Sequence, residues 1–225
     1  MPLNTIAVAI MAKAPSPGAV KTRLCPPLLE AEAAALYRCF LADKIAAVQT
    51  LSGARPVIAY TPDDAHAEFA TLAPDFTLVP QRGPDLGARL YSTLASLLAA
   101  GHPGAIAVDS DTPTLPREFL QRAVDCLMRP GPDVVLGPTE DGGYYLIGVR
   151  AAQRALFEDM PWSTSAVLEI TLRRAAAAGL QTECMPTWFD VDTPDDLRRL
   201  QTELDGSSSA AAARQTGRFI ASMRR

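Results

Sequence analysis

Apolar residues along this chain fall into short runs and longer periodic stretches that alternate from one end to the other. The short runs, bounded by Gly, Pro or Asp, predict strands. They cover Ile6–Met11, Pro56–Tyr60, Phe76–Val79, Ala105–Val108, Asp133–Leu136, Tyr144–Val149 and part of Gln181–Phe189. The longer stretches have the spacing of helices. They cover Leu28–Gln49, Ala65–Leu72, Leu86–Ala100, Arg117–Met128, Ala166–Ala178 and Pro194–Leu204.

Strands separated by helices predict parallel pairing. We therefore expect an α/β fold: a Rossmann-like, mostly parallel central sheet with helices on both faces. Gly179 suits the end of one helix, and Thr193 or Asp192 suits the start of the last one. Residues 1–205 then form one domain. Residues 206–225 begin with a Ser- and Ala-rich run and end basic, so we expect a flexible tail or a peripheral helix that lies outside the core and is dispensable for folding.

Composition narrows the functional classes. The chain has 225 residues, 48% of them apolar, and a formal charge of −4, so no basic surplus favours nucleic acid or an anionic membrane as partner. No apolar run is long enough to span a membrane, and the N-terminal run is expected to be a buried strand rather than a signal peptide. Four scattered cysteines predict reduced, mostly buried thiols in a cytoplasmic protein. His66 and His102 are too far apart in sequence to indicate a zinc site.

The first candidate site follows the first predicted strand. The loop reads Met-Ala-Lys-Ala-Pro-Ser-Pro-Gly-Ala-Val-Lys-Thr-Arg-Leu from residue 11 to residue 24. Small residues such as Ala12 let backbone N–H groups approach an anion, and Lys13, Lys21 and Arg23 offset phosphate charge. It is not a P-loop, because Val20 stands where that motif needs Gly. The loop therefore predicts phosphate binding, with a solvated basic loop as the alternative.

Carboxylates follow two other predicted elements. Asp109 and Asp111 come directly after the strand Ala105–Val108, and residues two apart in an extended chain point to the same side. Two like charges this close are expected to repel each other, and a hard cation such as Mg²⁺ would bind them. A simple turn is the alternative. Helix capping does not account for Asp190 in Phe-Asp-Val-Asp-Thr-Pro, so we assign Asp192, followed by Asp190, to the same metal site.

A glycine-containing segment between two predicted strands is the candidate acceptor site. It reads Gly-Pro-Thr-Glu-Asp-Gly-Gly-Tyr-Tyr-Leu-Ile-Gly from residue 137 to residue 148. Gly142 and Gly143 permit tight backbone beside a ligand, with Tyr144 next to them. Glu140 and Asp141 are placed to receive a hydroxyl or an amine. A hairpin turn is the alternative, because Asp-Gly is a strong turn signal.

Two weaker segments complete the set of candidates. Residues 81–89 form a Gly-punctuated loop that enters a helix, and we expect Asp85, Gly87 and Arg89 to face the nucleotide. Trp162 and Thr164, in Pro-Trp-Ser-Thr-Ser, suit a sugar face or a base, so we assign them to the acceptor side. Packing is the alternative for Trp162.

These motifs together resemble the DUF2064 family of bacterial glycosyltransferase-like proteins. The combination K-A-P-x-P-G-x-V-K-T-R-L, D-L-G-x-R, D-S-D-T-P-x-L, E-D-G-G-Y-Y-L-I-G, W-S-T and D-x-D-T-P-D-D-L occurs in order over about residues 3–204. The resemblance implies a GT-A (nucleotide-diphospho-sugar transferase) fold, a nucleotide on the N-terminal half and a metal at Asp111, completed by Asp192. Nucleotidyltransferase relatives carry a Gly-rich loop where this chain has the Pro-rich segment Ala12–Arg23, and this departure disfavours a triphosphate donor.

The motifs and the resemblance lead to one principal expectation. It is a metal-dependent glycosyltransferase that uses Mg²⁺ or Mn²⁺, a nucleotide-sugar donor and a small acceptor oriented by Glu140 or Asp141. One alternative is a nucleotidyltransferase that joins a nucleoside triphosphate to a small phosphorylated or phosphonate acceptor. The other is a nucleotide-binding module without catalytic activity.

Overall fold

A central sheet organises the molecule, and the computed structural model describes residues 3–205 and 212–223 of it. These residues form a seven-stranded sheet of order β3-β2-β1-β4-β6-β5-β7. The strands are β1 (Ile6–Lys13), β2 (Ala54–Thr61), β3 (Thr77–Pro80), β4 (Ala105–Val108), β5 (Val134–Pro138), β6 (Tyr144–Val149) and β7 (Thr182–Cys184). Only β6 runs antiparallel to its neighbours, β4 and β5, because a short turn rather than a helix joins it to β5. The predicted α/β class with a mostly parallel sheet is confirmed.

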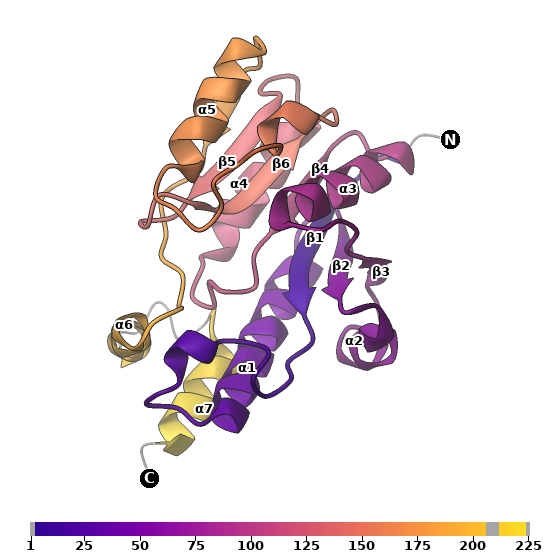
Figure 1. Ribbon diagram of the computed structural model, residues 1–225. Helices are drawn as coiled ribbons and strands as arrows, with labels where there is room; N and C mark the ends of the chain where they lie inside the picture. The colour runs from indigo at the N-terminus through magenta and orange to yellow at the C-terminus, as the bar shows by residue number, and fades with distance from the viewer. Residues whose placement is uncertain (1–2, 206–211, 224–225) are drawn as a thin grey trace.

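Helices cover both faces of this sheet, as Figure 1 shows. They are α1 (Glu30–Gln49), α2 (His66–Leu72), α3 (Leu86–Ala99), α4 (Arg117–Met128), α5 (Val167–Ala177), α6 (Pro194–Asp205) and α7 (Arg214–Met223). Single 3₁₀ turns, η1 (Thr22–Leu24), η2 (Asp63–Ala65) and η3 (Arg154–Leu156), lie in the connections. Gly179, with φ of 69°, follows α5, and the Thr193 hydroxyl accepts from the Asp196 amide at the start of α6, so both predicted caps are confirmed.

The core is divided into two layers by the alternation of side chains along the strands. In β1, Val8 and Ile10 pack against α1 and α4, whereas Ala7 and Ala9 face α3 and α5. All four residues are buried, which explains why this strand has a continuous apolar sequence. No helix among residues 3–205 and 212–223 is long and apolar enough to cross a membrane.

The C-terminal segment corrects one expectation from the sequence. Helix α7 packs along α1 and against α6, and Thr216 and Ile220 are buried. The buried carboxylate of Asp43, on α1, accepts the backbone N–H groups of Gln215 and Thr216, both at 2.9 Å. The part of the predicted tail that lies in residues 212–223 therefore belongs to the core, because its apolar face completes the layer beside α1. Residues 206–211, 224 and 225 lie outside the described residues.

The four cysteines are free, as expected, but their burial differs from the prediction. Cys126 is buried, Cys25 and Cys39 are partly exposed, and Cys184 is exposed at the end of β7.

Candidate functional site

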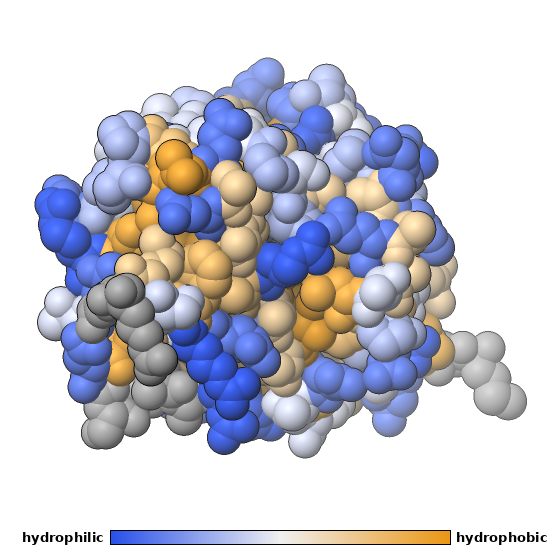
Figure 2. All heavy atoms as spheres, turned by 90° about the horizontal axis from the view of Figure 1, so that it is seen from below, coloured by the Kyte–Doolittle hydropathy of each residue, from blue (hydrophilic) through white to orange (hydrophobic). Residues whose placement is uncertain are grey.

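Four connecting segments meet at the carboxyl edge of the parallel strands. They are the loop after β1, residues 109–112 after β4, the turn of residues 139–143 between β5 and β6, and the segment of residues 185–193 after β7. This edge is where open α/β sheets bind ligands. Figure 2, which views the molecule from below, shows hydrophobic surface exposed between hydrophilic side chains on this side.

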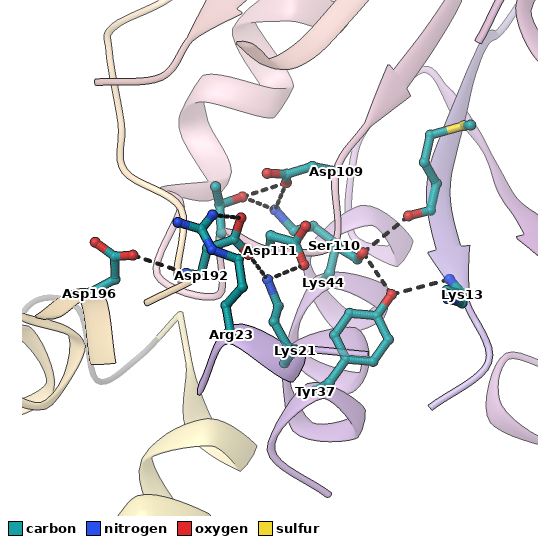
Figure 3. Close-up of polar contacts among 12 residues, drawn as sticks. Lys13, Lys21, Arg23, Tyr37, Lys44, Asp109, Ser110, Asp111, Asp192 and Asp196 are labelled. Atoms are coloured by element: carbon teal, nitrogen blue, oxygen red, sulfur yellow. Dashed lines mark hydrogen bonds and ion pairs between the residues drawn. The ribbon is translucent and has the colours of Figure 1, made fainter. Parts of the chain in front are cut away.

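Lys21 is the central cation of this edge. Its Nζ lies 2.6 Å from Oδ1 of Asp111 and 2.7 Å from Oδ1 of Asp192, so one ammonium joins the segments after β1, β4 and β7 (Figure 3). Burial alone lowers the pKa of Lys21, but the charges of Asp111 and then Asp192 outweigh it and hold the pKa above its usual value. Lys21 also takes a left-handed backbone conformation, with φ of 50°, which costs a non-glycine residue about 1 kcal/mol. The ion pairs hold it there.

Lys44 is a second buried ammonium that the motifs did not indicate. It comes from the C-terminal half of α1, and its Nζ lies 2.6 Å from the Thr112 hydroxyl and 3.4 Å from Oδ1 of Asp109. The Thr112 hydroxyl in turn donates to Asp109 at 2.7 Å. Burial raises the pKa of Asp109 and lowers that of Lys44, while their mutual attraction opposes both shifts. The sequence signal that could have identified Lys44 is the charged pair Asp43-Lys44, which lies between apolar residues of the predicted helix.

A hydroxyl network fixes β4 relative to β1. The Tyr37 hydroxyl lies 2.8 Å from that of Ser110, which donates to the Met11 carbonyl, and the Lys13 amide donates to the Tyr37 oxygen. Burial raises the pKa of Tyr37 to about 12, with a smaller contribution from Asp111, so the phenol stays protonated at neutral pH. Ser110 is thus held between the two carboxylates of the Asp-Ser-Asp segment.

A hollow of about 310 Å³ brings together Lys13, Lys21 and Arg89 of the predicted nucleotide-binding residues, and we call it the basic hollow. Its polar lining comes from Lys13, Lys21, Thr61, Gln81, Arg89, Ser110, Asp111 and Asp192, with Tyr37 behind, and Ala12 also lines it. Lys13 donates to the Ala19 carbonyl and Arg89 to the Gly83 carbonyl, which orients both cations. Arg23, also predicted to bind phosphate, does not line this hollow: its side chain is largely exposed and lies 3.8 Å from Asp192. Gln81, whose amide donates to the Ala12 carbonyl, was not predicted individually.

Asp85 and Gly87 do not lie in the basic hollow, so the structure corrects their predicted role. The Asp85 carboxylate accepts from the Ala88 amide at 2.8 Å and caps α3. Gly87 packs so closely that an added Cβ would meet the Phe157 carbonyl at 2.4 Å. Both line a separate hollow between α3 and η3. Their contribution to the site is therefore the position of α3 and of Arg89 on it.

A second hollow, of about 290 Å³, meets the basic hollow at Ser110 and Asp111, and we call it the acidic hollow. Its carboxylates are Asp109, Asp111, Asp141 and Asp190, and none of the described residues that line it is Lys, Arg or His. The predicted acceptor-side residues Gly143, Tyr144, Trp162 and Thr164 all line it. The Tyr144 and Trp162 rings are edge to face, with centroids 6.3 Å apart. The hollow thus combines aromatic walls with acceptors for hydrogen bonds.

The two acidic residues of the turn 139–143, Glu140 and Asp141, point in different directions. Asp141 accepts from the Gly143 amide at 3.1 Å and faces the acidic hollow. Gly142, with φ of +89°, does not line the hollow, and an added Cβ would meet the Ser165 carbonyl at 2.2 Å. Glu140 points elsewhere: it is exposed and pairs with Arg199 of α6 at 2.8 Å. The prediction that Glu140 acts on the acceptor is therefore corrected, because the turn directs successive side chains to opposite sides.

Asp190 was predicted to belong to the metal site, but the structure places it in the acidic hollow. It lines the hollow beside Asp141. Burial raises its pKa to about 7, with further contributions from Asp141 and Asp192.

The predicted metal ligands are not assembled as one cluster. Among residues 3–205 and 212–223, no three His, Cys, Asp or Glu side chains are arranged to hold a metal ion. Asp109 bonds to Lys44, whereas Asp111 and Asp192 converge on Lys21. The Lys21 ammonium lies between the last two, which shows that this pair accommodates a positive charge, and their carboxylate oxygens are of the type that a hard divalent ion would use. The expected repulsion between Asp109 and Asp111 is offset, because each has its own lysine.

Comparisons with known proteins agree with the fold. The DUF2064 family model, described as an uncharacterized protein conserved in bacteria, matches residues 44–164. A crystal structure of a "putative nucleotide-diphospho-sugar transferase" from Desulfovibrio desulfuricans G20 is 32% identical, covers 98% of each chain and has a TM-score of 0.84. Among curated proteins, none matches this chain.

More distant structures share the architecture alone. CMP:2-keto-3-deoxy-manno-octonic acid synthetase complexed with CTP is 13% identical, covers 89% of this chain and 99% of its own, and has a TM-score of 0.58. The inositol-1-phosphate CTP transferase from T. maritima is 14% identical, with coverages of 93% and 98% and a TM-score of 0.54.

Proposed function

This chain belongs to the DUF2064 family, and we propose that it is a metal-dependent glycosyltransferase. Such an enzyme moves a sugar from a nucleotide diphosphate to a small acceptor. The observation that carries the proposal is the junction at Asp111. A hollow with several cations and a hollow with several carboxylates meet there, at the carboxyl edge of the sheet. The 32% identity to the Desulfovibrio protein, described as a "putative nucleotide-diphospho-sugar transferase", supports the same class.

The basic hollow is the donor side. Lys13, Lys21 and Arg89 bind the diphosphate, and the exposed Arg23 assists them from beside Asp192, because charge-assisted hydrogen bonds are about twice as strong as neutral ones. The Gln81 side-chain amide donates both of its hydrogens to the carbonyls of Ala12 and Ala59, so it fixes the wall of this hollow rather than binding the phosphates. The anomeric carbon of the donor then lies toward Asp111, where the two hollows meet.

Asp111 and Asp192 would hold Mg²⁺ or Mn²⁺ where Lys21 now joins them, and Asp109 supports Asp111 from the neighbouring position. A bound divalent ion supplies Lewis-acid stabilisation of the charge that develops on the departing nucleoside diphosphate. Lys21 adds an ammonium on the same side of the reacting bond.

The acidic hollow is the acceptor side. Asp141 accepts the hydrogen bond of the acceptor hydroxyl or amine and takes its proton when the reaction inverts the anomeric carbon. Tyr144 and Trp162 offer aromatic faces to a sugar or polyol. Because the described lining is acidic and holds no cation, it disfavours a phosphorylated or phosphonate acceptor. The acidic lining therefore favours glycosyl transfer over nucleotidyl transfer, although the chain shares its fold with enzymes that use CTP.

Thermal denaturation with a panel of nucleoside diphosphates and nucleotide sugars, with and without Mn²⁺, tests the donor side. At one hundred times its Kd, a ligand of the folded state raises stability by about 2.7 kcal/mol. We expect stabilisation that needs both nucleotide and Mn²⁺ and that is reduced in Arg89→Ala. The matched control is Arg82→Ala, in the same loop but outside the basic hollow and paired with Asp63. Equal stabilisation of the two variants and the wild type would remove the basic hollow from the donor site.

A further inference from the structure

Lys21 is far more buried than the two carboxylates that it contacts. The Lys21 side chain is only 4% exposed, whereas those of Asp111 and Asp192 are 37% and 40% exposed. Lys21 therefore holds one oxygen of each carboxylate from inside the protein, while the other parts of both carboxylates remain open to solvent. In Figure 3 the lysine extends between the two acidic side chains.

The charges at this point determine what can bind. Two carboxylates and one ammonium carry a net charge of −1, and Arg23 lies 3.8 Å from Asp192. A divalent cation arriving alone meets a pair that is already largely neutralised, and it must either evict the buried ammonium or lie close to it. Both cost free energy, because like charges a few ångströms apart repel strongly where solvent is partly excluded.

A diphosphate removes this obstacle. Lys21 lines the basic hollow as well as touching the carboxylates, so its ammonium reaches phosphate oxygens without leaving its place in the chain. When the negative charge of the diphosphate arrives, it supplies a new partner for Lys21 and balances the added charge of the metal ion.

We propose that Lys21 is the resting counter-ion of the Asp111–Asp192 pair and makes the binding of divalent metal and of nucleotide mutually dependent. This inference rests on the proposed function, because it requires that both ligands bind at this junction. Metal without nucleotide binds weakly, and each ligand strengthens the binding of the other by the same factor, as linkage requires. Lys21 is thus a positioning residue in the metal-free protein and a phosphate ligand in the loaded one.

Calorimetric titration of the protein with Mn²⁺ alone tests this, with wild type, Lys21→Met and Lys21→Arg compared. Lys21→Met removes the ammonium at similar length, so we expect it to bind one Mn²⁺ roughly ten-fold or more tightly than wild type. Lys21→Arg keeps the charge and should bind Mn²⁺ as weakly as wild type. A tightening is a result that damage to the fold does not produce.

Two other outcomes would contradict the inference, and they are distinguishable. Equal Mn²⁺ affinity in wild type and Lys21→Met overturns the role of Lys21 and leaves the proposed function standing. Absence of Mn²⁺ binding in every variant, with and without ADP, CDP, GDP or UDP, overturns the metal site and the inference together. If Lys21→Met does not fold, Lys21→Gln, which also removes the charge, takes its place, and Mn²⁺ affinity equal to that of wild type again overturns the role of Lys21.

Discussion

Asp111 illustrates how one side chain can reverse a conclusion drawn from charge alone. From the Asp-Ser-Asp motif we expect the metal-free protein to keep or gain stability when one of two repelling carboxylates becomes an amide. The structure reverses this expectation, because Asp111 is a principal partner of the buried Lys21 ammonium. Asp111→Asn should therefore lower the free energy of unfolding in chelator, by about 1 kcal/mol since Asp111 is more than a third exposed and screened.

Thermal denaturation in EDTA measures this change, with Asp85→Asn as the matched control. Asp85 caps α3, and Asn is as good an N-cap as Asp, so that variant should melt close to wild type. A melting temperature of Asp111→Asn above that of wild type would show that repulsion, not the Lys21 ion pair, dominates at this position.

Site residues that follow strands were predicted from the sequence, whereas those carried by a helix, and the directions of side chains in a turn, were not. Lys13, Lys21, Asp111 and Asp141 were recognisable because each follows a predicted strand or lies in a Gly-containing turn. Lys44 was not, since a helix carries it to the site from far along the chain and no local motif marks that face. Nor does the sequence show that Glu140 and Asp141, although adjacent, point to opposite sides of their turn.

Among the elements, α7 shows why low complexity next to a helix is a poor guide to packing. The strands and long helices were predicted to within a few residues because their apolar periodicity is strong. The C-terminal helix has few apolar residues, and its docking depends on Asp43, which lies far away in the sequence.

Truncation after Asp205 should consequently destabilise the protein rather than leave it unchanged. It exposes the surface that Ile220 covers and leaves the buried Asp43 carboxylate without two backbone donors. Together these losses should cost about 2–4 kcal/mol and lower the melting temperature by on the order of 10 °C. Truncation after Met223, which removes only Arg224 and Arg225, is the control, and equal melting of the two truncated chains would show that α7 contributes nothing to stability.

The turn between β5 and β6 gives a second prediction at this scale. Gly142→Ala introduces a Cβ at a left-handed position, 2.2 Å from the Ser165 carbonyl, so either the turn or the segment bearing Trp162 and Thr164 must move. We expect a loss of roughly 1–3 kcal/mol in denaturant unfolding. Gly131→Ala, where an added Cβ meets nothing within 4 Å, should be nearly neutral. A neutral Gly142→Ala would mean that this turn is not tightly packed.

For the whole molecule, the arrangement of strands explains why residues scattered from Lys13 to Asp192 form one site. Parallel strands deliver their following loops to one edge. β5 is one of them and brings the turn of residues 139–143 to that edge, from which the antiparallel β6 runs back across the sheet. This much follows from strand order, and it was predictable in outline. The division of the edge into a basic and an acidic hollow was not, because it depends on which way each side chain turns.

The central claim is transfer of a sugar between these two hollows, and analysis of the leaving group tests it most directly. The protein is incubated with Mn²⁺, a panel of nucleotide sugars and nucleoside triphosphates, and neutral, amine-bearing and phosphorylated small acceptors, and the released nucleotide products are quantified. We predict nucleoside diphosphate release from a nucleotide sugar with a hydroxyl or amine acceptor, lost in Asp111→Asn. Pyrophosphate release from a triphosphate with a phosphorylated acceptor would contradict the account and establish nucleotidyl transfer instead.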